Sequence, residues 1–262
     1  MRGYARFAII GFRTNLAYRW ESIAGTVSYL VSVAMGIELW RALYRNGGDR
    51  QILSASELNT YLVLTAGIRA ALTMDEFFIE QRVKKGTIAV DMMRPLSFHG
   101  MLFAYTIGGA LQRLLTQVAP SVVLIAWLYG VQAPPSLAAA LFAVLSALLS
   151  VVLLFELNLL VWSAALWGHS TWSYVTIKEA MIQLLCGAVV PIWFFPTWLQ
   201  TVLALTPLDS LVHVPVALYL GKLNGAGALV ALAKQAAWAV GAMLLGSLVC
   251  RRGLRSAVVY GG

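Results

Sequence analysis

Charged residues are scarce in this chain. Of its 262 residues, only 11% are Asp, Glu, Lys or Arg, whereas 60% are hydrophobic. A soluble domain has about 25% charged residues. Because so few polar side chains cannot cover a surface in water, the composition excludes an ordinary soluble domain and places the chain in a lipid bilayer.

Sequence signatures of catalysis and nucleotide binding are missing as well. The chain contains no G-x-x-x-x-G-K-[ST] phosphate loop, no G-x-S-x-G and no H-E-x-x-H. Its three histidines fall in different segments, and Cys186 and Cys250 lie in apolar segments without metal-ligand spacing. We therefore predict no catalytic residue, no metal site and no cofactor in this chain, and we expect both cysteines to be buried thiols.

Nucleic acid is not an expected partner, although the formal net charge is +8. The basic residues cluster beside apolar runs, where membrane topology and anionic lipid headgroups account for them. We therefore expect membrane lipids, and no nucleic acid, at these residues.

Apolar runs long enough to cross a bilayer follow one another along the chain. A hydrocarbon core of about 30 Å requires roughly 20 helical residues. We predict an all-α polytopic membrane protein, one transmembrane domain over residues 1–262, with about six transmembrane helices. Spans one and two occupy 20–73 (20–40 and 58–73), spans three to five occupy 101–190 (101–130, 137–167 and 175–190), and the sixth occupies 226–250.

Three segments of the chain carry further structural expectations. Residues 1–19 place Arg2, Arg6 and Arg13 on one helical face, which predicts an interfacial helix, or a merely basic flank of the first span. The second span is short, so we expect it to continue as one helix into the following charged stretch and to carry Arg69 to the interface. Pro120 is expected to bend the third span.

Residues 191–221 hold four of the eight prolines and are too broken for one straight helix. We predict two short re-entrant helices dipping into the outer leaflet between the fifth and sixth spans. The candidate outer gate lies at the start of this segment, although an interfacial aromatic belt fits the same residues. It comprises Pro191, Trp193, Phe194, Phe195, Pro196 and Trp198.

The long charged stretch at 74–100 and both ends of the chain carry most of the basic residues. By the positive-inside bias, this asymmetry predicts that residues 74–100, the N-terminus and the tail at 251–262 are cytoplasmic. The segments 41–57 and 209–222 are expected to face outward.

Glu156 is an ionisable residue inside the fourth span, which is costly in a bilayer and suggests a functional contact. With Asn158 and Arg113 it forms our candidate set for a translocation path, and Arg113 or Lys234 is its expected partner. A carboxyl packed and hydrogen-bonded between helices is the alternative interpretation.

Two motifs carry a family resemblance. The segment K-K-G-T-I-A-V-D-M-M-R-P-L-S, from Lys84 to Ser97, resembles a segment of type-2 ABC transporter permeases. The later A-V-V-P-I-W-F-F-P-T-W-L is similar to the stretch after that family's fifth span, and the arginine-rich tail is similar as well. The resemblance covers essentially the whole chain and points to the bacterial branch that exports drugs and antibiotics.

The resemblance implies that 1–19 is the connecting helix and that 74–100 is the region coupled to an ATPase. Gly86 permits a bend, Thr87 is expected to cap a short helix, and Pro95 to end it. Ile88, Met92 and Met93 are expected to enter a groove on the ATPase. The full set of expected coupling residues is Lys84, Lys85, Gly86, Thr87, Ile88, Asp91, Met92, Met93, Arg94 and Pro95.

The function implied is the permease subunit of an ATP-driven exporter of hydrophobic or amphipathic compounds in the bacterial cytoplasmic (inner) membrane. The implied partners are two copies of an ABC ATPase, which bind ATP and Mg²⁺, and a second permease subunit, identical or paralogous. A proton-coupled secondary transporter using Glu156 and a non-transporting membrane assembly protein are the alternatives.

Overall fold

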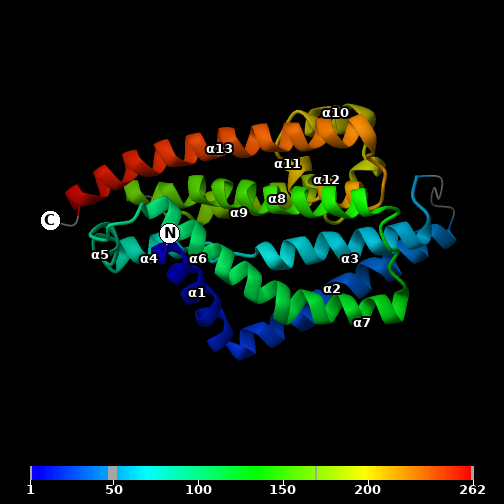
Figure 1. Ribbon diagram of the computed structural model, residues 1–262, viewed down its shortest axis with the longest axis horizontal. Coiled ribbons are helices and arrows are strands. Elements are labelled where there is room, and N and C mark those ends of the chain that lie inside the picture. The colour runs from blue at the N-terminus through cyan, green and yellow to red at the C-terminus, as the bar shows by residue number, and fades with distance from the viewer. Residues whose placement is uncertain (1, 47–51, 169, 261–262) are drawn as a thin grey trace.

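The computed structural model describes residues 2–46, 52–168 and 170–260, and these contain helices but no strand. The long helices run side by side (Figure 1), so the predicted all-α class is confirmed. Both termini lie toward one end of the bundle, together with the short helices α4 (Phe78–Lys84) and α5 (Ile88–Met92). We call this the termini end.

Four helical stretches within the described residues are long and apolar enough to cross a membrane. They are α2 (Arg19–Arg45), the stretch from α6 (Phe98–Arg113) to α7 (Ala119–Tyr129), α8 (Leu137–Ser163) and α13 (Gly225–Tyr260). The expected second and fifth spans correspond to α3 (Ala55–Leu72) and α9 (Trp172–Leu185), which are shorter. The short 3-10 helix η2 (Ala164–Trp167) extends α8, and α13 runs on into the expected tail.

The third expected span changes direction between α6 and α7 (Figure 1). A π-helical turn, η1 (Leu114–Val118), lies immediately before Pro120, which stands in the first turn of α7. Proline has no N–H to donate to the carbonyl four residues earlier, and a π turn absorbs that defect without ending the helix. The predicted bend at Pro120 is therefore confirmed.

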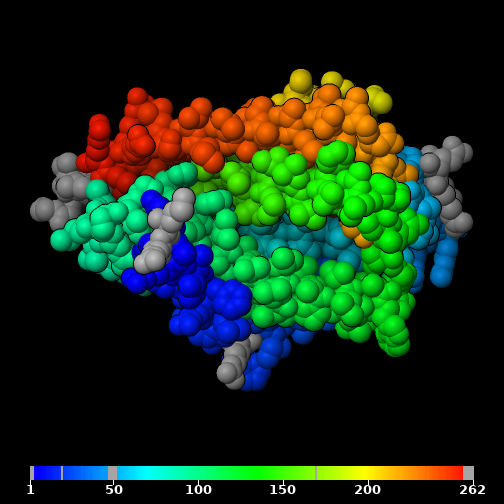
Figure 2. Space-filling model, viewed as in Figure 1, coloured from blue at the N-terminus to red at the C-terminus, as the bar shows by residue number. Residues whose placement is uncertain are grey.

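Helix α1 (Arg2–Ala17) packs directly on α6, as the blue and green surfaces in Figure 2 show. Two glycines permit this contact. A Cβ on Gly11 would overlap the backbone of Tyr105, and a Cβ on Gly108 would overlap the carbonyl of Ala8. The predicted N-terminal helix is present, and it belongs to the packed bundle.

The proline-rich segment is broken into more pieces than the two helices expected. It forms η3 (Ile192–Phe194), α10 (Thr197–Ala204), α11 (Leu208–Leu211) and α12 (His213–Tyr219). The buried Gln235 of α13 secures this segment to α8, because its Nε2 donates to the Ser210 carbonyl at 2.8 Å and to the Ser146 carbonyl at 3.0 Å. Lys234 adds an ion pair to Asp209 at 2.5 Å.

The expected continuation of the second span into the charged stretch is wrong. Helix α3 ends at Leu72, Thr73 has extended backbone (ψ 133°), and α4 begins only at Phe78. Figure 1 shows α3 ending near mid-length of the bundle, while α13 continues to the termini end. Arg69 therefore lies inside the bundle and not at its end.

Replacing Gly108 by Ala should destabilise the protein, because the new methyl group meets the Ala8 carbonyl and overpacking costs about 1–3 kcal/mol. Gly241→Ala is the matched control, since nothing lies within 4 Å of its added Cβ. Thermal unfolding in detergent should show a lower melting temperature for Gly108→Ala only. Equal melting temperatures would contradict the close crossing of α1 and α6.

Candidate functional site

Side chains of other helices bind backbone carbonyls at the end of α3 and in the segment that follows it, inside the bundle. Arg113 of α6 donates through Nε to the Ala71 carbonyl at 3.3 Å, and Trp162 of α8 donates through Nε1 to the Glu76 carbonyl at 2.9 Å. A cation at a helix C-terminus also interacts favourably with the helix dipole. Arg113 thus stabilises the early end of α3.

Lys178 of α9 forms a second polar cluster beside the same segment. Its side chain is 9% exposed, and Nζ lies 2.6 Å from Glu76 and 3.1 Å from Glu179. Nζ also donates to the Asn158 side-chain oxygen, and the Asn158 amide contacts the Met74 sulfur at 3.0 Å. Asn158 therefore contacts the segment that follows α3, and Arg113 binds the last turn of α3 just before that segment.

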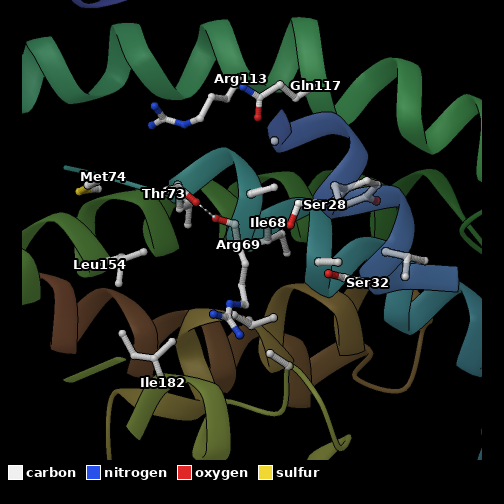
Figure 3. Close-up of a pocket in the computed structure, with 18 of the residues that line it drawn as sticks. Ser28, Ser32, Ile68, Arg69, Thr73, Met74, Arg113, Gln117, Leu154 and Ile182 are labelled. Carbon is white, nitrogen blue, oxygen red and sulfur yellow. Dashed lines mark hydrogen bonds between the residues drawn. The ribbon is translucent and has the colours of Figure 1, made fainter. Parts of the chain in front are cut away.

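A cavity of about 820 Å³ lies beside the end of α3. Its wall comes from α2, α3, α6, η1, α8 and α9, with Asn15 of α1, Leu211 of α11 and residues of the links, and Figure 3 shows part of it. Arg69 and Arg113 lie on this wall with several uncharged polar residues. These are Asn15, Ser22, Ser28, Ser32, Thr73, Gln112, Gln117 and Asn158.

A second cavity, of about 830 Å³, adjoins the first toward α4 and α5. The two share Asn15, Glu21, Met74, Asp75 and Arg113 as lining residues. Arg113 donates to the Asn15 side chain at 3.3 Å, so this pair stands on the shared wall. The two cavities together run from the interior of the bundle to the helices at the termini end.

Aromatic rings of α2 and α3 contact η3 near the part of the first cavity that Trp40 lines. Trp40 of α2, which lines the cavity, packs on Phe194 with ring centroids 4.8 Å apart, and Tyr61 of α3 packs on Trp193 at 5.7 Å. The Tyr61 hydroxyl also donates to the Gly187 carbonyl at 2.7 Å. The structure thus brings Trp193 and Phe194 together as a contact between η3 and the helices α2 and α3.

The remaining candidate gate residues lie elsewhere. Phe195 packs in a separate core with residues such as Leu153 and Ile182, and Trp198 is 66% exposed. Pro191 precedes η3, and Pro196 precedes α10. The exposed Trp198 fits an interfacial aromatic better than a gate.

Glu156 is 1% exposed, and its partner is a residue that our sequence analysis missed. His99 of α6 lies 2.7 Å from its Oε1, whereas neither Arg113 nor Lys234, the expected partners, pairs with it. Its Oε2 lies against Gly246 of α13, where a Cβ would overlap it, and has no hydrogen-bond partner among the described residues. Glu156 lines neither cavity, so the packed carboxyl is the interpretation that fits.

The predicted short helix in the charged stretch is present as α5, and Gly86 before it has φ +68°, the left-handed turn that glycine favours. The helix ends before Pro95, as expected. The expected cap is wrong, because the Thr87 hydroxyl makes no cap hydrogen bond and donates instead to the Arg82 carbonyl at 3.4 Å.

Two expected contact residues of this region are turned inward. Ile88 is 7% exposed and packs with Met74, Ile79 and other core residues. Asp91 is 4% exposed, pairs with Arg82 and lies 3.5 Å from Arg94. Ile88 therefore cannot enter a partner's groove in this conformation, and Asp91 is an internal ion-pair partner.

The outward surface of α5 consists of apolar side chains flanked by basic ones. Met93 is 84% exposed, Val90 57% and Met92 38%. The remaining coupling residues, Lys84, Lys85, Gly86, Arg94 and Pro95, are also exposed. We call Val90, Met92 and Met93 the α5 apolar surface.

Glu80 ties α4 to the residues that begin α9. It accepts from the Lys84 ammonium at 2.6 Å and from the Thr171 backbone N–H at 2.9 Å, and the Thr171 hydroxyl donates to it as well. The hydrogen bond from Lys84 first, and those from Thr171 next, lower the pKa of Glu80 to about 2. This link between α4 and α9 was not predicted, because nothing in the sequence pairs positions 80 and 171.

Glu80→Gln should lower the melting temperature at neutral pH. Because the folded-state pKa of about 2 lies below the ordinary value of 4.5, the stabilisation is fully present above pH 4.5 and is lost as pH falls toward 2. The gap between wild type and variant, measured by thermal unfolding in detergent, should therefore shrink below pH 4.5. Glu38→Gln, which removes an exposed carboxylate paired with Arg41, is the control. A gap independent of pH would contradict the role of Glu80.

Comparison with known proteins supplies the family. The model of the ABC-2 family transporter protein matches residues 30–261, which is most of the chain. Neither the curated proteins nor the solved structures contain a match to it. The chain belongs to the ABC-2 transporter family and is a multi-pass membrane permease component of an ABC transporter, a transport subunit that is not catalytic by itself.

Proposed function

We propose that this chain forms the translocation path of an ATP-driven exporter for a hydrophobic or amphipathic compound. The observation that carries the proposal is the pair of adjoining cavities, which leads from the interior of the bundle to α4 and α5. The path would be closed at its far side by the contact of Trp193 and Phe194 with α2 and α3.

The partner ATPase would push on the α5 apolar surface. Family membership implies an ABC ATPase partner in general. Exposed methionine and valine with basic neighbours suit a partner groove that is apolar with an acidic rim, because charges at a rim set orientation and apolar anchors supply affinity. Met92 and Met93 remain the residues expected to enter that groove, and the exposed Val90 takes the place of the buried Ile88.

A displacement of α5 would be transmitted to the wall of the first cavity by two sets of polar contacts. The Arg82–Asp91 ion pair joins α4 to α5, and the hydrogen bonds from Thr171 to Glu80 join α4 to the start of α9. Helix α9 in turn lines the first cavity with Glu179 and Ile182. A push at α5 therefore has a connected route to the cavity wall.

The complete transporter would contain two such permease subunits, identical or paralogous, and two ATPase subunits that bind ATP and Mg²⁺. It would lie in a bacterial cytoplasmic membrane among membrane lipids, with the termini end in the cytoplasm. The proton-coupled alternative loses support because Glu156 is sealed between His99 and Gly246 and lines neither cavity.

Met93→Asp should prevent association with the ATPase and abolish ATP-driven export, because a carboxylate would be desolvated in an apolar groove. Ser173→Asp is the matched control, since it adds the same charge at an exposed position in the first turn of α9 that lines neither cavity. Copurification of the ATPase and ATP-dependent export from vesicles are the measurements. Normal association and export by Met93→Asp would show that the ATPase docks elsewhere.

The proposed orientation predicts which loops a membrane-impermeant maleimide can reach. With Cys186 and Cys250 replaced by Ala, Lys85→Cys in intact cells should react only after permeabilisation, because it lies at the termini end. Asn224→Cys, in the exposed link between α12 and α13, should react from outside without permeabilisation. The reverse pattern would contradict the orientation.

A further inference from the structure

Arg69 is the one charged residue of α3 that projects into the first cavity. Figure 3 shows its side chain extending away from Arg113 and Gln117 of the α6–η1 stretch, toward Ile182 of α9. It is half-buried, three residues before the end of a helix that stops inside the bundle. The guanidinium is therefore held at depth, away from the end of the bundle.

Among the described residues, no side chain or backbone oxygen forms a hydrogen bond or ion pair with the Arg69 guanidinium. The carboxylates that line the same cavity are bound elsewhere or lie apart. Glu76 and Glu179 pair with Lys178, and Asp75 accepts from the Phe77 N–H at 3.0 Å. Glu21 lies in the first turn of α2, on the wall shared with the second cavity.

An unpaired cation at membrane depth is costly, and such residues usually contact a substrate or an ion. Arginine presents a planar fork of donors that suits the two oxygens of a carboxylate or phosphate. The hydroxyls of Ser28 and Ser32 lie on the same wall and can donate further hydrogen bonds to such an anion.

Apolar side chains form another part of the cavity wall, beside the polar residues already named. It includes Val33, Leu62, Ile68, Leu154, Ile182 and Leu211. A volume of about 820 Å³ lies within the range of pockets that enclose small organic ligands. Of the two arginines on this wall, Arg113 is bound to Ala71 and Asn15, so Arg69 is the cation that remains for a head group. The apolar part of the wall suits a hydrocarbon body.

We propose that Arg69 binds the anionic head group of an amphiphile in this cavity, and that the exporter's cargo is of this class. Only the statement that this amphiphile is the exported compound rests on the proposed function. Binding to the cavity requires neither the ATPase nor transport. The same anionic chemistry occurs in a free amphiphile and in a lipid head group, and the experiment separates the two.

The test measures binding of a dansyl-labelled fatty acid to the purified permease in nanodiscs of phosphatidylcholine, followed by fluorescence. Wild type should bind the acid and bind its methyl ester far more weakly. Arg69→Gln should lose about tenfold to a hundredfold in affinity for the acid, as expected for a charged hydrogen bond, and Arg69→Lys should retain part of it. Arg251→Gln, which removes an exposed arginine of α13 remote from this wall, should bind like wild type.

Addition of phosphatidylglycerol to the nanodiscs identifies the source of the anion. Competition with the fatty acid would support the proposal with a lipid head group as the natural ligand, and lack of competition would support it with a free amphiphile. Equal affinity for acid and ester, or unchanged binding by a well-folded Arg69→Gln and Arg69→Lys, would overturn it. Failure of the ATPase to associate would refute the proposed function alone and would leave these binding results unaffected.

Discussion

The length of α3 is the constraint on which the rest of the structure depends. Its 18 residues extend about 27 Å, less than the roughly 30 Å of a hydrocarbon core. The chain therefore leaves the helix inside the bundle, where unpaired carbonyls are costly. Arg113 binds the Ala71 carbonyl at this end, Trp162 binds the Glu76 carbonyl in the turn that follows, and Lys178 pairs with the Glu76 carboxylate. The first cavity lies beside this early end.

Buried polar side chains bind partners on other segments elsewhere in the molecule as well. Gln235 binds the carbonyls of Ser146 and Ser210, so a side chain of α13 fixes the broken segment to α8. Glu80 holds the link before α9, and His99 holds Glu156. Arg69, with no such partner among the described residues, stands apart from this pattern, which is why it points to a ligand.

Composition and hydropathy were sufficient to predict the helical class, the order of the long helices and the bend at Pro120, because these depend on local properties of the chain. The short helix between Gly86 and Pro95 follows from local backbone preferences as well. Tertiary pairing was not predictable in this way. Ile88 and Asp91 were expected to face a partner, yet the first packs in the core and the second pairs with Arg82, since burial depends on residues distant in sequence. The pairing of Glu156 with His99 joins positions 57 apart and has no local signal.

If the ATPase acts on α5 as proposed, the first cavity should change shape during the ATP cycle. Spin labels at Ser28 of α2 and Ile182 of α9, on opposite sides of this cavity, would report the change by pulsed electron resonance in the reconstituted transporter, after Cys186 and Cys250 are replaced. The distance distribution should shift between the nucleotide-free state and the state trapped with ATP and vanadate. The shift should disappear in Met93→Asp. An unchanged distribution in a transporter that still exports its cargo would show that the action of the ATPase does not reach this cavity.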